Sequence, residues 1–250
     1  MYTVKISAII IFVFALFISN SIVVSEIPGA VEEPGVSHMS DRIQTTFVEN
    51  TGQVADSEIA FFANFLDGVV FVKRSGILSY DFLPDENNNV FIIEKFTPQK
   101  VTLVPLEPPP TDIISLYKQR GYIQADHANY YRMSLGEIYK GIELELRVFT
   151  DSLDKFLTIS PQGNTEVIQI KLEGIKGLTV DKIGRLELTT DFGAVNLTKP
   201  NAFQVIENER KPIEISYRIH KGSVYGFKVG KYDKKQPLMI HYKTRKGEDQ

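Results

Sequence analysis

IELELRV, residues 142–148, decides the fold class of this chain. Apolar residues alternate with charged ones, so an extended strand here has one apolar face and one charged face. This pattern is typical of an antiparallel strand with one face in the core and the other in water. Shorter alternating segments recur downstream at Ile168–Leu172, Leu186–Leu188, Val195–Leu197, Ile213–Ile219, Tyr225–Val229 and Leu238–Tyr242.

Upstream of this stretch the sequence also predicts strands. Segments 68–73 and 77–82 form a hairpin with a Gly-containing loop, and 90–96 and 101–106 are further strands. One short helix is predicted at 113–120, with Asp112 as its N-cap. A single helical turn is also expected at 134–139.

Many short strands separated by turn residues predict a mostly β protein with an antiparallel β-sandwich-like fold and one short helix near 113–120. We expect a single domain over residues 43–242. Two sub-lobes, 43–104 and 122–242, are the alternative, because a proline-rich stretch lies between them. The strand pattern also predicts that charged side chains lie on the exterior.

The N-terminus has the layout of a secretory signal peptide. Lys5 precedes an unbroken apolar run, Ala8–Ile18, which is followed by small polar residues. The run is shorter than the roughly 20 apolar residues of a membrane span. We therefore expect residues 1–25 to be a signal peptide, 26–42 a flexible spacer and 243–250 a polar tail. An uncleaved membrane anchor is the alternative.

Composition excludes several classes of function. With 28 basic and 31 acidic residues the net charge is −3, and no basic stripe marks a nucleic-acid surface. Cysteine is absent, which removes thiol nucleophiles, Cys-ligated zinc and iron–sulfur clusters. We expect no cofactor, and contact with a membrane only through an uncleaved leader. Export predicts a secreted or cell-envelope protein.

The chain contains 4 histidines, and none lies in a recognisable catalytic pattern. His38 falls in the spacer, and His220 and His241 lie in the strand-rich part of the chain. His127 follows Asp126, a pairing that can orient an imidazole. A hydrogen bond within a loop is the stronger interpretation of that pair.

Carboxylates give no stronger signal. Residues 85–89 resemble the start of a calcium loop, but Val90 stands where the turn glycine belongs and Phe96 where the closing acid belongs. Glu143 and Glu145 share one strand face, which marks a solvated face more than a pair of hydrolase acids. We therefore predict no catalytic, cofactor-binding or metal-binding residue.

The most unusual polar cluster is residues 49–53, Glu-Asn-Thr-Gly-Gln, directly after apolar Phe47 and Val48. Asn50 and Gly52 are residues that form tight turns, so the cluster is expected to end the first strand. Presentation of a ligand-binding loop is the alternative.

Several ordered segments carry a resemblance to a known family. Phe47–Gln53, Asn129–Tyr131, Ile138–Leu144, Lys199–Gln204 and Val229–Asp233 are similar to an uncharacterised all-β domain. That domain precedes SBBP-type beta-propeller repeats in bacterial secreted and surface proteins. The resemblance implies an all-β fold and a bacterial envelope setting, and it implies no catalytic residue.

These observations together predict an exported, non-enzymatic module with a structural, adhesion or interaction role. Its expected partner is another envelope protein or a surface glycan. A carbohydrate-binding module, with Tyr130 and Tyr131 as stacking platforms, is the first alternative. A carboxylate-dependent hydrolase is the second.

Overall fold

Nearly all of the described chain is β-strand. The structure is a computed structural model, and it describes residues 44–65, 68–85, 88–96, 101–109 and 128–246. One sheet consists of β1 (Phe47–Glu49), β2 (Ile59–Phe65), β3 (Gly68–Lys73), β4 (Leu78–Asp85), β5 (Asn88–Lys95), β7 (Asn129–Tyr130), β11 (Ile170–Glu173), β17 (Ile215–His220) and β18 (Val224–Val229). The other consists of β6 (Val104–Leu106), β8 (Arg132–Tyr139), β9 (Ile142–Phe149), β10 (Ser152–Ile159), β12 (Gly177–Val180), β13 (Leu186–Thr190), β14 (Gly193–Leu197), β15 (Asn201–Ile206), β16 (Glu209–Ile213) and β19 (Leu238–Lys246).

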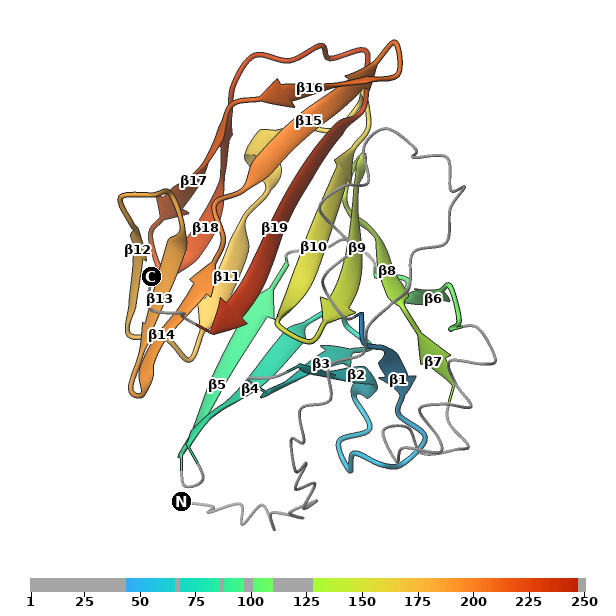
Figure 1. The fold of residues 1–250 in the computed structure, drawn as a ribbon, viewed down its shortest axis with the longest axis vertical. Helices are drawn as coiled ribbons and strands as arrows, with labels where there is room; N and C mark the ends of the chain where they lie inside the picture. Colours follow the sequence, from blue (N-terminus) through green and yellow to red (C-terminus); the bar gives the residue numbers. More distant parts are fainter. Residues whose placement is uncertain (1–43, 66–67, 86–87, 97–100, 110–127, 247–250) are drawn as a thin grey trace, which may run out of the picture. The chain divides into compact units, whose positions relative to one another are not determined.

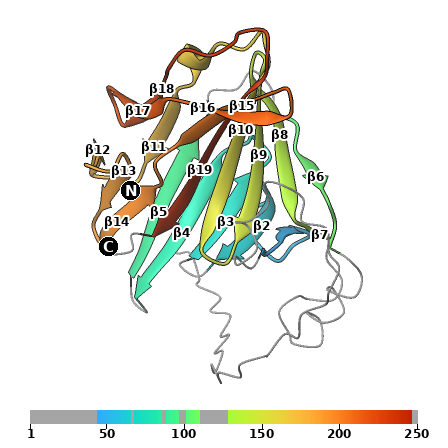
Figure 2. The same ribbon diagram turned by 45° about the horizontal axis from the view of Figure 1, so that its top comes forward.

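Both sheets are antiparallel (Figure 1). The 9-stranded sheet has the order β17-β18-β11-β5-β4-β3-β2-β1-β7. The 10-stranded sheet has the order β12-β13-β14-β19-β10-β9-β8-β6, and the hairpin β15–β16 joins it through β19. Figure 2 shows β9, β10 and β19 lying across β3, β4 and β5. The predicted antiparallel β-sandwich-like class is confirmed.

The alternation in residues 142–148 has the predicted structural result. Ile142, Leu144, Leu146 and Val148 in β9 are all 0% exposed and face the space between the sheets. The predicted hairpin is also present, because β3 pairs with β4 along its length.

The predicted helical turn at 134–139 is wrong. This segment is part of β8, in which Met133 and Leu135 are buried on the core side. Bulges after Ser134 and Glu137 shift the register against β9 and disturb the strict alternation.

The predicted helix at 113–120 lies outside the described residues, as do the signal peptide and spacer. Among the residues that the structure does describe, the helical element is a short 3-10 turn, η1 (Thr165–Val167). In that same part of the chain, no helix has the length and apolar character needed to cross a bilayer.

One hydrophobic core fills the space between the sheets. It includes Phe47, Tyr80 and Ile92 from the first half of the chain, and Leu157 and Tyr242 from the second half. Both sheets lie within one compact unit, residues 41–250.

Candidate functional site

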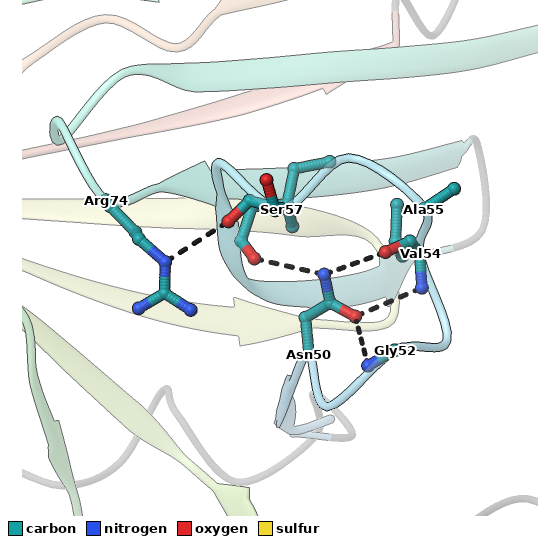
Figure 3. A pocket seen from close by; sticks show the side chains of 7 residues that line it. Asn50, Gly52, Val54, Ala55, Ser57 and Arg74 are labelled. Atoms are coloured by element: carbon teal, nitrogen blue, oxygen red, sulfur yellow. Dashed lines mark hydrogen bonds between the residues drawn. The ribbon is translucent and has the colours of Figure 1, made fainter.

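The polar loop after β1 is held by the Asn50 side chain (Figure 3). Its Oδ1 accepts hydrogen bonds from the backbone N–H groups of Gly52 and Val54, both at 3.1 Å. Its Nδ2 donates to the carbonyls of Val54 and Ile59, both at 3.0 Å. These bonds satisfy backbone groups that leave the sheet at the end of β1. The turn-forming interpretation of residues 49–53 therefore describes this loop.

Gln53 completes the same loop. Its Oε1 accepts from the N–H of Thr51 at 2.6 Å, and its Nε2 donates to the carbonyl of Glu49 at 3.0 Å. The amides of Asn50 and Gln53 are thus both engaged in holding the loop.

A surface hollow of about 350 Å³ lies beside the loop. Arg74 borders it, and the Arg74 Nε donates to the carbonyl of Ser57 at 3.2 Å (Figure 3). The rest of the lining consists of Asn50, Gly52, Val54, Ala55, Ser57 and Ile59. Since Asn50 is already engaged, the polar groups of the lining mainly bond to the loop itself.

The least expected group is an ion pair sealed between the two sheets. Lys155 Nζ, on β10, lies 2.7 Å from Glu94 Oε2, on β5. The two side chains are 0% and 2% exposed. The prediction that charged side chains lie on the exterior is therefore wrong for these two residues.

Hydroxyl groups surround this pair. Tyr80 donates to Glu94 Oε2 at 2.7 Å, and Tyr225 donates to Glu94 Oε1. Tyr225 and Tyr242 place their hydroxyls 3.2 Å apart. The Lys155 ammonium donates to Thr244 Oγ1 at 2.5 Å, so every charged atom of the pair has polar neighbours.

The pKa values within this cluster are shifted by burial. Loss of hydration lowers the pKa of Lys155, and the charge of Glu94 opposes that shift. Burial first, and the Glu94 charge second, raise the pKa of Tyr80 and Tyr225 well above the ordinary value. The phenols are therefore neutral donors at physiological pH.

The sequence contains a signal for this cluster, namely a lysine among the alternating apolar residues of one strand. In β10, Leu153, Lys155, Leu157 and Ile159 occupy alternate positions and are all buried. A lysine at a position with the parity of the apolar residues indicates a buried charge, which requires a partner in the core.

The outer face of β10 and β19 holds a second polar cluster, around His241. His241 Nε2 lies 3.0 Å from Asp154 Oδ2, and Asp154 Oδ1 accepts from Ser152 Oγ at 2.8 Å. The serine thus donates to the acid instead of to the imidazole, and Ser152 is 0% exposed. A serine nucleophile needs a base on its hydroxyl and access to substrate, and this arrangement supplies neither.

Glu143 and Glu145 lie on the outer face of β9, as predicted. Glu145 Oε1 accepts from Arg132 Nε at 2.9 Å and from Arg147 Nε at 2.8 Å. Burial alone raises the pKa of Glu145, but these arginines outweigh it and hold the pKa below its usual value. A carboxylate held ionised cannot act as the general acid of a hydrolase.

Of the two tyrosines considered as sugar platforms, Tyr130 has its ring packed against another aromatic ring. Tyr130 is half-buried in β7 and makes an edge-to-face contact with Phe61, with ring centroids 6.2 Å apart. Tyr131 donates its backbone N–H to the carbonyl of Glu107.

Some candidate residues cannot be placed. His38, Asp126 and His127 lie outside the described residues, and so does the middle of the 85–89 loop. Among the side chains that are described, no three His, Asp or Glu residues gather as metal ligands. His220 ends β17 and is half-buried.

An apolar surface covers part of the outer face of the 9-stranded sheet. Strand register places Val48, Phe62, Phe71, Ser79 and Ile93 in one row across β1, β2, β3, β4 and β5. The neighbouring row holds Val69, Asp81 and Phe91. Phe91 is 56% exposed. We call these residues the apolar sheet face.

Asp81 is the ionisable group within this face. Asn89 Nδ2 donates to its Oδ2 at 3.4 Å, whereas Oδ1 is buried without a hydrogen-bond partner. Burial raises the pKa of Asp81 because the carboxylate loses hydration that is not replaced.

Comparison with known families gives one match. A family described as a domain of unknown function (DUF7948) matches residues 47–241. The chain belongs to the DUF7948 family. The DUF7948 match begins at the first strand, β1, and ends within the last, β19, so it covers both sheets. No curated protein and no solved structure matches this DUF7948 chain.

Proposed function

We propose that this chain is an exported, non-enzymatic interaction module of the bacterial cell envelope or surface. It binds another envelope protein through the apolar sheet face. The observation that carries this proposal is the row of apolar side chains on the outer face of the 9-stranded sheet, with exposed Phe91 beside it. The apolar side chains of this row are half-buried and Phe91 beside them is exposed, and a contiguous apolar patch on a surface is typical of protein interfaces.

The chemistry of the partner follows from Asp81. Its carboxylate places a negative charge among the apolar side chains of this face, so a lysine or arginine of the partner is the expected counter-charge. Aliphatic neighbours such as Val69 and Ile93 favour an apolar protein surface around that cation over a sugar, which binds to aromatic platforms and polar groups.

Other observations support a binding role over a catalytic one, and an exported location over a cytosolic one. The Lys155–Glu94 pair is sealed from substrate, and Ser152 and Glu145 are engaged in structural bonds. The leader at residues 1–25 and the absence of cysteine suit a bacterial envelope protein.

Site-specific photocrosslinking in the native host tests this proposal. Benzoylphenylalanine replaces Phe91 in one strain and Phe192 in another, because both phenylalanines are exposed and Phe192 lies away from the apolar sheet face. We expect a light-dependent adduct with one envelope protein from position 91 only. Phe71→Glu, checked for folding by circular dichroism, should abolish that adduct.

Three outcomes would contradict the proposal. They are equal adducts from both positions, no adduct from position 91, and an adduct with a second copy of this chain. A polysaccharide adduct would instead favour the carbohydrate-binding alternative. Export is tested in the same strains by the N-terminal mass and by cell fractionation, and a cytosolic chain that retains residues 1–25 would refute it.

A further inference from the structure

The Lys155–Glu94 pair joins the two sheets in a place that water does not reach. Its side chains are 0% and 2% exposed, and Nζ lies 2.7 Å from Oε2, an atom bonded to the carboxyl carbon of Glu94. Keeping two opposite charges in such a place costs much of the attraction between them, since each ion loses its hydration. A neutral product of the same two groups avoids that cost.

We propose that Lys155 and Glu94 condense in the folded protein into an amide that links β10 to β5. The Nζ lone pair attacks the carboxyl carbon of Glu94, a C–N bond forms and a C–O bond breaks. One water molecule leaves, with its oxygen from Glu94 and its protons from Lys155 and the carboxyl group. Nothing is oxidised or reduced, so no co-reactant is required.

The reaction begins from the neutral forms of both groups. An ammonium has no lone pair and a carboxylate is a poor electrophile, so a proton must first pass from Nζ to the carboxylate. The 2.7 Å contact provides a direct path for that proton. Burial favours the transfer because it lowers the pKa of Lys155.

The surrounding hydroxyls are placed to assist the attack. Tyr80 and Tyr225 each donate to one oxygen of Glu94, and they can stabilise the oxygen that becomes negative during addition. The Tyr242 hydroxyl, 3.2 Å from that of Tyr225, extends the path along which a proton can reach the departing oxygen. Thr244 Oγ1 fixes the position of Nζ.

The fixed positions of Lys155 and Glu94 also favour the condensation. Both groups lie on central strands of packed sheets, so they are held in contact without loss of further freedom. The link would close the chain between residues 94 and 155 covalently. In an exported chain with Cys 0, it takes the place that a disulfide has in other exported proteins.

The chain contains a matched control for this chemistry. Lys95 Nζ and Glu173 Oε2 also lie 2.7 Å apart, but their side chains are 36% and 34% exposed. Water stabilises both charges there, so this pair should remain ionic. The control shares the residue types and the distance, and differs in burial.

Intact mass measurement and peptide mapping of the purified full chain test whether the amide forms. The measured intact mass should be lower, by the mass of one water molecule, than the mass calculated for the same sequence without the link. Trypsin should fail to cleave after Lys155 and should release residues 75–95 joined to residues 148–171, while cleavage after Lys95 stays complete. An intact mass without the deficit, together with cleavage after Lys155, would overturn the proposal even if no variant folds.

Variants of single residues test which side chains form the link and which hydroxyl assists its formation. Lys155→Met should lose the mass deficit, and Lys95→Met should retain it. Tyr225→Phe should leave a large fraction of molecules without the link, and a complete deficit in that variant would refute the role of the Tyr225 hydroxyl. This inference does not rest on the proposed function, since its readout is a covalent bond within the chain.

Discussion

Two carboxylates on the outer faces of the sheets have opposite environments. Asp81 has one buried oxygen without a partner, and its pKa is raised by burial. Glu145 receives hydrogen bonds from Arg132 and Arg147, and its pKa is lowered despite its own burial. At the scale of single residues, the donors around a carboxylate decide the sign of its contribution to stability.

Asp81→Asn should stabilise the fold at neutral pH. The folded state raises the pKa of Asp81, so the charged form destabilises it, and that penalty disappears as pH falls below the unfolded value. We expect the free energy of unfolding to rise by less than about 1 kcal/mol at pH 7, because the side chain keeps part of its hydration. Urea unfolding at neutral pH and near pH 3 measures the difference, and equal changes at both would contradict this account.

Glu145→Gln should have the opposite effect. A lowered pKa in the folded state means that the contribution is present above the unfolded pKa and is lost as pH falls through the folded pKa. The substitution should reduce the free energy of unfolding by about 1 kcal/mol at pH 7, since three charge-assisted hydrogen bonds from two arginines weaken in a partly exposed place. The same urea titrations should show this loss shrinking in acid, and Glu143→Gln is the control.

At the scale of elements, the junction between β11 and β5 depends on a glycine. Gly174 follows β11 with φ +84, and a Cβ there would lie 2.0 Å from the carbonyl oxygen of Phe91 on β5. No side chain fits between these two backbones. Gly222 has a similar positive φ, +76, but a Cβ at that position would meet nothing within 4 Å, so it lacks the close approach.

Substitution by alanine separates the two effects. Gly222→Ala should cost about 1 kcal/mol, the usual penalty of a left-handed conformation. Gly174→Ala should cost at least about 2 kcal/mol more, because the pairing of β11 with β5 must shift. Thermal unfolding of both variants measures this, and similar losses would show that the junction adapts.

At the scale of the whole molecule, one core joins segments that the proline-rich stretch separates in sequence. Tyr80 from the first half and Leu157 from the second belong to one hydrophobic cluster, and Glu94 meets Lys155 within it. Such a core is expected to unfold in one cooperative transition.

Leu157→Ala tests that cooperativity. Leu157 is 0% exposed, so its truncation should reduce the free energy of unfolding by about 2–5 kcal/mol. Far-UV and near-UV circular dichroism should shift together to the same lower midpoint. Two separate transitions, with only one of them shifted, would instead support independent lobes at 43–104 and 122–242.

The sequence by itself determined which face of many strands is buried. In residues 142–148 each side chain alternates across the strand, so the apolar half must face the core whatever the strand pairs with. The polar loop at Asn50 was similarly local, because the Asn50 hydrogen bonds reach no further along the chain than Ile59. Strand β10 was not among the predicted strands, but its inward-facing residues follow the same alternation. Lys155 occupies one of the positions that the buried apolar residues of β10 share.

The tertiary structure alone decided which side chains surround Lys155 and which side chains share a sheet face with Asp81. Lys155 meets Glu94 because β10 and β5, in different sheets, cross there, and the apolar sheet face exists because separate strands pair in one register. A period of two places a side chain on a face but contains no information about which distant strand lies opposite. Strand order and sheet packing, which depend on the free energy of the whole core, choose that partner.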